Sequence, residues 1–218
     1  MNEAIHSGQQ LGPVLWIGGT PCSGKTSIAD LLAETYQLQV YHCDEAFETH
    51  KLQMSATRKL MTISWDELWM QPLDMLVADV FAIYREEFQL IIDDLRALPP
   101  WPPILAEGMA LLTNLVAPLL ANQECAVWVI PTPDFQRERY PLRGAWVQDI
   151  LHQCADPDQA FRNWMNRDIA SARIIAAATV AHNLRLIEVD GQRPIASIAA
   201  TIEDQFRPFL QHATRIIQ

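Results

Sequence analysis

One segment of the 218-residue sequence combines residue types that bind phosphate. Residues 19–26 read Gly-Thr-Pro-Cys-Ser-Gly-Lys-Thr and match the pattern G-x-x-x-x-G-K-[ST]. In such a loop the glycines let the backbone come close to an anion, and the backbone N–H groups converge on it together with the next helix N-terminus. Lys25 adds a positive charge for the outer phosphates, and the Thr26 hydroxyl is a ligand for Mg²⁺. The segment therefore predicts a site for ATP with Mg²⁺.

The predicted phosphate site covers nine consecutive residues. These are Gly19, Thr20, Pro21, Cys22, Ser23, Gly24, Lys25, Thr26 and Ser27. A chance match to the pattern is expected about 3 times in 10,000 chains of this composition. A short apolar run precedes the segment and a helical pattern follows it, which is the context that the pattern requires. The alternative is a Gly-rich turn between a strand and a helix, with no ligand.

Two acidic residues are candidates for the chemistry next to this loop. Asp44 follows the predicted strand 39–42, where it could accept the proton of a substrate hydroxyl that attacks the γ-phosphorus. Alternatively, Asp44 is the N-cap of the helix that follows, and the two roles can coexist. Glu107 ends another predicted strand, where it could hold Mg²⁺ through a water molecule or bind substrate. A buried glutamate needs a cationic or metal partner, so we expect one there.

The charge balance argues against several kinds of partner. The chain has 26 acidic and 16 basic residues, a formal net charge of −10, and such a surface repels nucleic-acid backbones and anionic lipid. No apolar run reaches the 18 residues that a membrane-spanning helix needs, and residues 1–13 do not resemble a secretory signal. The four cysteines stand far apart without a C-x-x-C pair, which fits a reducing compartment. We therefore expect a cytoplasmic protein without general nucleic-acid or membrane binding.

The elements that position these residues alternate between strand and helix. Short apolar runs predict strands over 14–18, 39–42, 104–107, 125–130 and 184–189. Helical patterns cover 25–36, a brief segment opened by the capping box at Ser64, 73–98, 156–181 and 194–206. This order predicts an α/β fold with a parallel sheet covered on both faces, in which ligands bind beyond the carboxyl ends of the strands.

The sequence resembles the P-loop NTPase superfamily, and within it the nucleoside and nucleotide kinase-like branch of small-molecule kinases. The phosphate loop carries the resemblance, with the lone acidic residue of Glu107-Gly108 and the long helical segment before it. The N-K-x-D and D-x-x-G motifs of GTPases are missing from the sequence. The resemblance implies a three-layer α/β/α sandwich with strand order 2-3-1-4-5, the cofactors ATP and Mg²⁺, and a small hydroxyl-bearing acceptor. It also implies that an Asp after the second strand acts as the base, here Asp44.

The same resemblance implies a lid over residues 132–156. Its arginines would neutralise charge on the transferred phosphoryl group, and we expect Arg139 and Arg143 in this role. Pro141 ends the helix between them, and Arg137 points away from Arg139. The alternative is a solvated, salt-bridged helix. Arg167, on the next long helix, is predicted to lie mostly on the surface, and Arg193 is predicted to lie in an ordinary Asp-Gly turn rather than beside adenine.

The predicted organisation is a tail over residues 1–12 and one domain over 13–218, with a helical substrate-side insertion at 43–102. Aromatic and histidine side chains in that insertion are more typical of a core than of a pocket that stacks a flat substrate. They are Phe47, His50, Trp65, Trp69 and Tyr84. Two other functions stay open: a non-catalytic ATP-binding module, and a kinase for a nucleotide-sugar or macromolecular acceptor. The acceptor and the oligomeric state do not follow from the sequence.

Overall fold

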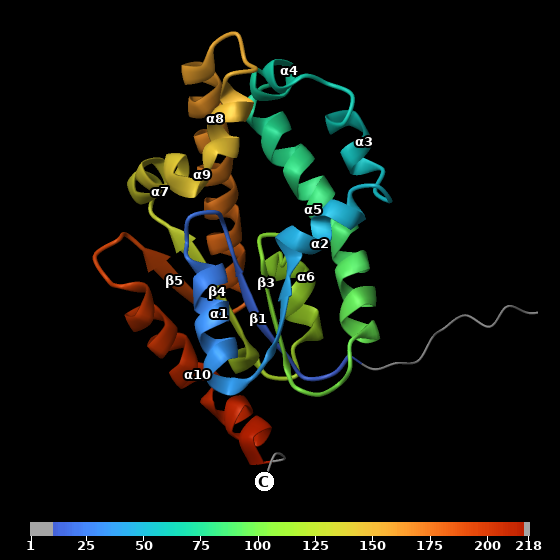
Figure 1. The fold of residues 1–218 in the computed structure, drawn as a ribbon, viewed down its shortest axis with the longest axis vertical. Coiled ribbons are helices and arrows are strands. Elements are labelled where there is room, and N and C mark those ends of the chain that lie inside the picture. The colour runs from blue at the N-terminus through green and yellow to red at the C-terminus, as the bar shows by residue number, and fades with distance from the viewer. Residues whose placement is uncertain (1–10, 216–218) are drawn as a thin grey trace, which may run out of the picture.

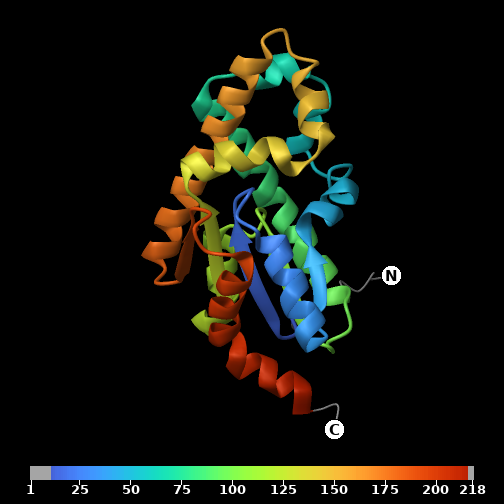
Figure 2. The same cartoon turned by 60° about the vertical axis from the view of Figure 1, so that its left-hand side comes forward.

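A five-stranded sheet lies between two layers of helices (Figures 1 and 2). The computed structural model describes residues 11–215, without the side chains of Lys59 and residues 211–215, so most of the predicted tail lies outside the described residues. The strands are β1 (Val14–Gly19), β2 (Gln39–His42), β3 (Ile104–Gly108), β4 (Ala126–Pro131) and β5 (Arg185–Val189). All neighbouring pairs are parallel, in the order β2-β3-β1-β4-β5. The predicted fold class and strand order are confirmed.

Each face of the sheet is covered by its own hydrophobic core. Helices α1 (Lys25–Tyr36) and α10 (Ile195–Arg215) cover one face around Ile17, Leu105 and Val127. On the other face, α5 (Leu73–Ala97), α6 (Thr113–Val116) and α9 (Pro157–Ala181) pack over Trp16 and Trp128. Because both faces are buried, the central strands β1, β3 and β4 are buried at every position and read as continuous apolar runs.

Shorter helices gather at the carboxyl end of the sheet. The segment between β2 and β3 begins with α2 (Cys43–His50), α3 (Ala56–Leu60) and α4 (Trp65–Trp69). The segment after β4 contains α7 (Pro133–Arg139), the 3₁₀ helix η3 (Tyr140–Arg143) and α8 (Ala145–Leu151). In Figure 1, α3, α4 and α8 lie at the same end of the molecule as the first turns of α5 and α9. The predicted insertion and lid segments are therefore both helical and both rise above the sheet.

Local capping signals place the helix starts correctly. Ser64 and Glu67 form the predicted capping box of α4, with the Glu67 N–H donating to Ser64 Oγ at 3.1 Å. Asp156 caps α9 by accepting from the Gln159 N–H at 2.9 Å. The end of α10 differs from prediction: the helix continues past residue 206 because Leu210, beyond Pro208, extends its buried face. Strand β4 begins one residue later than predicted, since Cys125 ends the 3₁₀ helix η2 (Gln123–Cys125).

The core over α1 and α10 gives a first prediction. Phe206 is fully buried in it, so Phe206→Ala removes a large side chain and leaves a cavity. We expect the variant to lose roughly 3–5 kcal/mol of unfolding free energy in urea denaturation. Val180→Ala, at an exposed position of α9, is the control and should stay within about 0.5 kcal/mol of the wild type. Equal losses in both variants would contradict this account of the core.

Candidate active site

The phosphate loop connects the central strand β1 to helix α1. Gly19 has φ +140, and a Cβ there would lie 1.9 Å from the Val129 carbonyl oxygen. Gly24 has φ +81, and a Cβ there would lie 2.4 Å from Ile195 Cδ1. Both positions therefore require glycine. Between them Cys22 adopts a left-handed conformation with φ 67, which is uncommon for a residue with a side chain.

The polar groups of this loop have few protein partners. Thr20 Oγ1 and Ser23 Oγ are buried without a hydrogen-bond partner among the described residues. Lys25 is 5% exposed, and within residues 11–215 no carboxylate lies at ion-pair distance from its ammonium group. The first residue after the loop, Ile28, donates its backbone N–H to the Gly24 carbonyl at 3.0 Å. Buried polar groups need partners, so the loop suits an anion that supplies them.

Thr26 and Glu107 lie together beside the loop. The Thr26 hydroxyl donates to Glu107 Oε1 at 3.1 Å, and His42 Nδ1 lies 2.8 Å from the same oxygen. The parallel register explains this, because Glu107 pairs with Ile17 of β1 and with His42 of β2. Glu107 is 2% exposed, and its Oε2 has no hydrogen-bond partner among the described residues. A hydroxyl and a free carboxylate oxygen are the hard ligands that Mg²⁺ prefers, so these residues fit that ion.

Asp44 lies at the same edge of the sheet. Helix α2 begins at Cys43 with His42 as its N-cap, so the alternative that Asp44 is the N-cap is wrong, and Asp44 lies in the first turn with its side chain exposed. Burial raises the pKa of the Cys43 thiol, and the charges of Glu87, Glu107 and Asp44 raise it further while Lys25 lowers it. The predicted base, the predicted metal ligand and the loop lysine therefore all act electrostatically on one buried thiol.

The lid arginines lie on aromatic rings beside the loop. The Arg139 guanidinium carbon lies 5.2 Å from the Phe135 ring centre, and that of Arg143 lies 5.2 Å from the Tyr140 ring centre. Helix α7 ends at Arg139, as Pro141 predicts, so the two arginines do not share an α-helical face. Burial raises the pKa of Cys22 to about 11, and the charges of Arg143, Lys25 and Arg139 oppose this rise. Both arginines are therefore within electrostatic reach of the phosphate loop.

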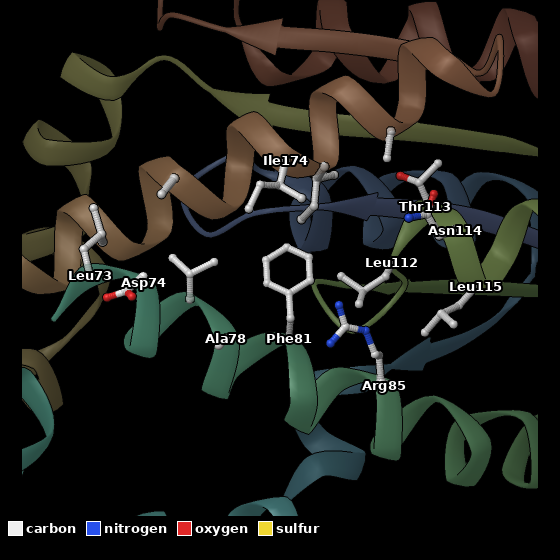
Figure 3. A pocket seen from close by; sticks show the side chains of 14 residues that line it. Leu73, Asp74, Ala78, Phe81, Arg85, Leu112, Thr113, Asn114, Leu115 and Ile174 are labelled. Atoms are coloured by element: carbon white, nitrogen blue, oxygen red, sulfur yellow. The ribbon is translucent and has the colours of Figure 1, made fainter. Parts of the chain in front are cut away.

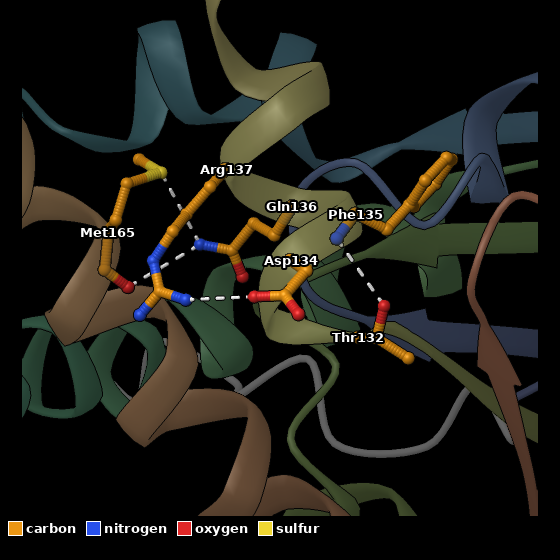
Figure 4. A network of polar contacts seen from close by, with 6 residues as sticks. All are labelled: Thr132, Asp134, Phe135, Gln136, Arg137 and Met165. Carbon is orange, nitrogen blue, oxygen red and sulfur yellow. Dashed lines mark hydrogen bonds and ion pairs between the residues drawn. The ribbon is translucent and has the colours of Figure 1, made fainter.

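The start of the lid is fixed to helix α9 (Figure 4). The buried Gln136 side chain donates from Nε2 to the Met165 carbonyl at 3.5 Å, and Thr132 caps α7 by accepting from the Phe135 N–H at 3.4 Å. Arg137 pairs with Asp134 at 3.3 Å on the exposed side of the same helix. Arg137 thus forms the surface ion pair that the alternative interpretation predicts for this segment, whereas Arg139 and Arg143 form none with the residues that the structure describes.

The prediction that Arg167 lies mostly on the surface is wrong. Its side chain is 17% exposed, and its Nη2 lies 2.6 Å from Asp168 Oδ1, which also accepts from its Nε at 2.8 Å. The guanidinium carbon lies 4.9 Å from the Trp69 ring centre, and Trp69 stacks on Trp164 at 4.4 Å. The adjacent Arg167 and Asp168 could have suggested an ion pair, but their spacing on the helix does not predict that α4 packs over this pair.

Five side chains from three helices interact electrostatically, and we call them the Tyr84 cluster: Asp44 of α2, Tyr84 and Glu87 of α5, and Arg167 and Asp168 of α9. Burial raises the pKa of Tyr84, and Arg167, Asp44, Asp168 and Glu87 are the charged groups that act most strongly on it. Arg167 lies on Trp69, which belongs to the hydrophobic cluster against which Cys22 of the phosphate loop packs. The charges of the Tyr84 cluster therefore act close to the loop.

Of the other predicted candidates, His50 contacts one member of this cluster. It is buried between Glu87, 3.6 Å from its Nδ1, and Asp94, 3.0 Å from its Nε2, whereas Trp65 is 39% exposed. The predicted aromatic residues of the insertion thus do not line a single wall. Arg193 donates to Ser197 and Thr201 of α10, as expected for a residue of an ordinary turn.

A separate groove of about 780 Å³ lies between α5 and α9 (Figure 3). Residues 73–85 of α5, residues 170–178 of α9 and residues 112–115 contribute its mostly apolar lining. None of the predicted site residues lines it. Its position shows that the apolar space between these helices is distinct from the loop and the Tyr84 cluster.

Glu87 gives a prediction about pH. Burial, with the charge of Asp44, raises its pKa from 4.5 to about 8. Between these values the folded protein keeps a proton that the unfolded chain has released, so the unfolding free energy falls as the pH rises. Glu87→Gln, which stays neutral, should reduce this fall when urea unfolding is compared at pH 5 and pH 8.

The adjacent Glu86→Gln provides a control with the opposite sign. The Glu86 carboxylate accepts from the backbone N–H groups of Ser55 and Ala56, and these bonds lower its pKa. The contribution of Glu86 to the unfolding free energy is present above pH 4.5 and is lost as the pH falls through its lowered pKa. If Glu87→Gln shows the same pH dependence as the wild type, Glu87 is ionised in the folded protein.

Comparisons with solved structures found several kinases that are similar to this chain. Similar solved structures include a shikimate kinase from Aquifex aeolicus, 15% identical over 89% of this chain and 96% of that chain, with a TM-score of 0.44. A gluconokinase from Sinorhizobium meliloti is 15% identical over 95% and 98%, with a TM-score of 0.42. A shikimate kinase from Acinetobacter baumannii, in complex with shikimate, is 13% identical over 92% and 94%, with a TM-score of 0.45.

The strand order β2-β3-β1-β4-β5 and the phosphate loop between β1 and α1 agree with the resemblance to small-molecule kinases of the P-loop superfamily. No protein-family model and no curated protein matches the sequence. At these identities and TM-scores, the reaction has to be argued from the site itself. Within residues 11–215 no helix is both long and apolar enough to cross a bilayer.

Proposed function

We propose that this protein is an ATP- and Mg²⁺-dependent phosphotransferase that moves the γ-phosphate to a hydroxyl group of a small molecule. One observation carries the proposal: a phosphate loop with unpartnered polar groups adjoins the Thr26–Glu107 pair, whose second carboxylate oxygen is also unpartnered. Asp44 lies at the same edge of the sheet. These observations support a donor site, a metal site and a base that lie together at the carboxyl ends of parallel strands.

Each residue of the site has a distinct role in this proposal. The loop amides and Lys25 bind and orient the phosphates, and the in-line attack then depends mostly on positioning. Asp44 accepts the proton of the acceptor hydroxyl as the oxygen attacks the γ-phosphorus. Arg139 and Arg143 stabilise the charge of the transition state when the lid carries them from their aromatic rings toward the phosphates.

The Mg²⁺ ion would be held by the Thr26 hydroxyl and, directly or through water, by Glu107. When bound, it neutralises phosphate charge. His42 keeps the Glu107 carboxylate in place from the other side, at 2.8 Å, and Asp30 lies 3.5 Å from the second His42 ring nitrogen. This chain of contacts orients the carboxylate toward the loop.

Transfer from labelled ATP tests the proposal. The protein with ATP and Mg²⁺ is incubated with hydroxyl-bearing metabolites, and phosphorylated products are identified by mass spectrometry. ATP at 100 times its dissociation constant should also stabilise the fold by roughly 2.7 kcal/mol. Absence of stabilisation at millimolar ATP and Mg²⁺ rules out the donor site. Stabilisation without any transfer favours a non-catalytic ATP-binding module, and transfer only to a nucleotide-sugar or a macromolecule favours the other alternative.

A further inference from the structure

The Tyr84 cluster has a charge distribution that restricts the acceptor. Arg167 lies on Trp69, and Cys22 of the phosphate loop packs against the hydrophobic cluster that contains Trp69, so this part of the Tyr84 cluster adjoins the loop, where an acceptor hydroxyl must approach Asp44. Two of its carboxyl groups are almost fully buried: Glu87 is 1% exposed and Asp168 is 0% exposed. Glu87 Oε1 and Asp168 Oδ2 lack hydrogen-bond partners among the described residues. Both can form hydrogen bonds with a hydroxyl group, and the Asp168 carboxylate repels a further anion, whereas Glu87 keeps its proton up to about pH 8 and adds no charge below it.

The one cation of the cluster is already neutralised. Arg167 contacts Asp168 through two nitrogens, at 2.6 and 2.8 Å, and the face of its guanidinium lies against Trp69. Such a pair, held in a fixed geometry, presents little net charge to a ligand. The other cations near the loop, Lys25, Arg139 and Arg143, lie at the donor phosphates in the proposed function. Asp44 adds a negative charge that no cation of the cluster offsets.

We infer that the acceptor is a hydroxyl-bearing molecule without a carboxylate or phosphate group, and that Asp168 enforces this choice by neutralising Arg167. The inference rests on the proposed function, because it concerns the acceptor side of the same site. An anionic substrate would meet the carboxylates of Asp44 and Asp168 with no free cation of the cluster beside them, whereas the hydroxyl and amine groups of a neutral or amine-bearing substrate can donate hydrogen bonds to them.

A charge-matched set of probes tests this inference. Glucitol, gluconate and 1-amino-1-deoxyglucitol have the same chain of hydroxyl groups and differ in charge. Their binding is measured by thermal shift at constant ionic strength, with the donor site saturated by Mg²⁺ and a non-hydrolysable ATP analogue. The wild type should show no stabilisation by gluconate. Asp168→Asn, which frees the Arg167 charge at unchanged shape, should strengthen gluconate binding about 10-fold or more relative to glucitol.

Two controls separate the outcomes. Asp158→Asn, at an exposed position of α9, should leave the gluconate-to-glucitol ratio unchanged. If Asp168→Asn does not fold, the double variant Arg167→Gln/Asp168→Asn replaces the ion pair by two neutral side chains. Its gluconate affinity should equal that of the wild type. The inference is overturned if the wild type binds gluconate and the double variant does not. It is also overturned if the Asp168→Asn variant folds but gains no affinity for gluconate.

The same experiment measures nucleotide binding at the donor site separately. Stabilisation by the ATP analogue reports whether the phosphate loop works in every variant. If the analogue fails to stabilise the wild type, the proposed function fails. If the analogue binds and gluconate also binds through Arg167, the proposed function survives and only the inference about the acceptor fails.

Discussion

Lys25→Ala is expected to abolish nucleotide-dependent stabilisation and to lower phosphoryl transfer by roughly 10²–10³-fold, the loss typical of removing one preorganised donor for transition-state charge. The reason is the placement of this lysine. Its side chain is 5% exposed beside the loop, and the described residues offer its ammonium no counter-ion. Removing an unpaired buried charge should not destabilise the fold without nucleotide, and can stabilise it.

The measurement is thermal unfolding with and without ATP and Mg²⁺, together with initial rates of transfer. Lys51→Ala is the matched control, because Lys51 pairs with Glu48 on the surface at 2.5 Å, away from the loop. We expect the control to retain both the roughly 2.7 kcal/mol of stabilisation at 100 times the dissociation constant and the transfer rate. A Lys25→Ala variant that is still stabilised by ATP would show that the phosphates bind elsewhere.

Asp44→Asn is expected to lower kcat by roughly 10²–10⁴-fold while nucleotide binding is retained. The amide keeps the shape of the side chain and can no longer take the proton of the acceptor hydroxyl. Because Asp44 lies in the first turn of α2 and is exposed, the substitution removes no packing. The change should therefore appear in kcat and leave the stabilisation by ATP unchanged.

Glu45→Gln is the control for Asp44, since Glu45 is the next residue of the same turn and is also exposed. Its kcat should remain within a few-fold of the wild type. If Asp44→Asn retains full activity, the base is another group, and Glu87 of the same cluster would be the next to test. If both variants lose activity equally, the reaction requires the negative charge at the start of α2 rather than one specific base.

The phosphate site and the sheet were predictable because their signals are local. The spacing of Gly19, Gly24, Lys25 and Thr26 reflects a backbone path that short-range sterics impose, and the structure shows why a Cβ at either glycine would collide. The apolar runs of β1, β3 and β4 predict a sheet buried on both faces, and its order followed from the resemblance. Capping residues such as Ser64 and Asp156 placed the helix starts for the same local reason.

The tertiary structure alone decided which distant residues meet. Parallel register places Glu107 beside His42, and the start of α1 brings Thr26 to the same carboxylate. The packing of α4 and α9 buries Arg167 against Trp69 and Asp168. Sequence spacing carries no information about such contacts, because they depend on how elements far apart in the chain pack at one end of the sheet. The sequence by itself thus determined the phosphate-loop pattern and the layered architecture, while the charges of the Tyr84 cluster were brought together only by the packing of its helices.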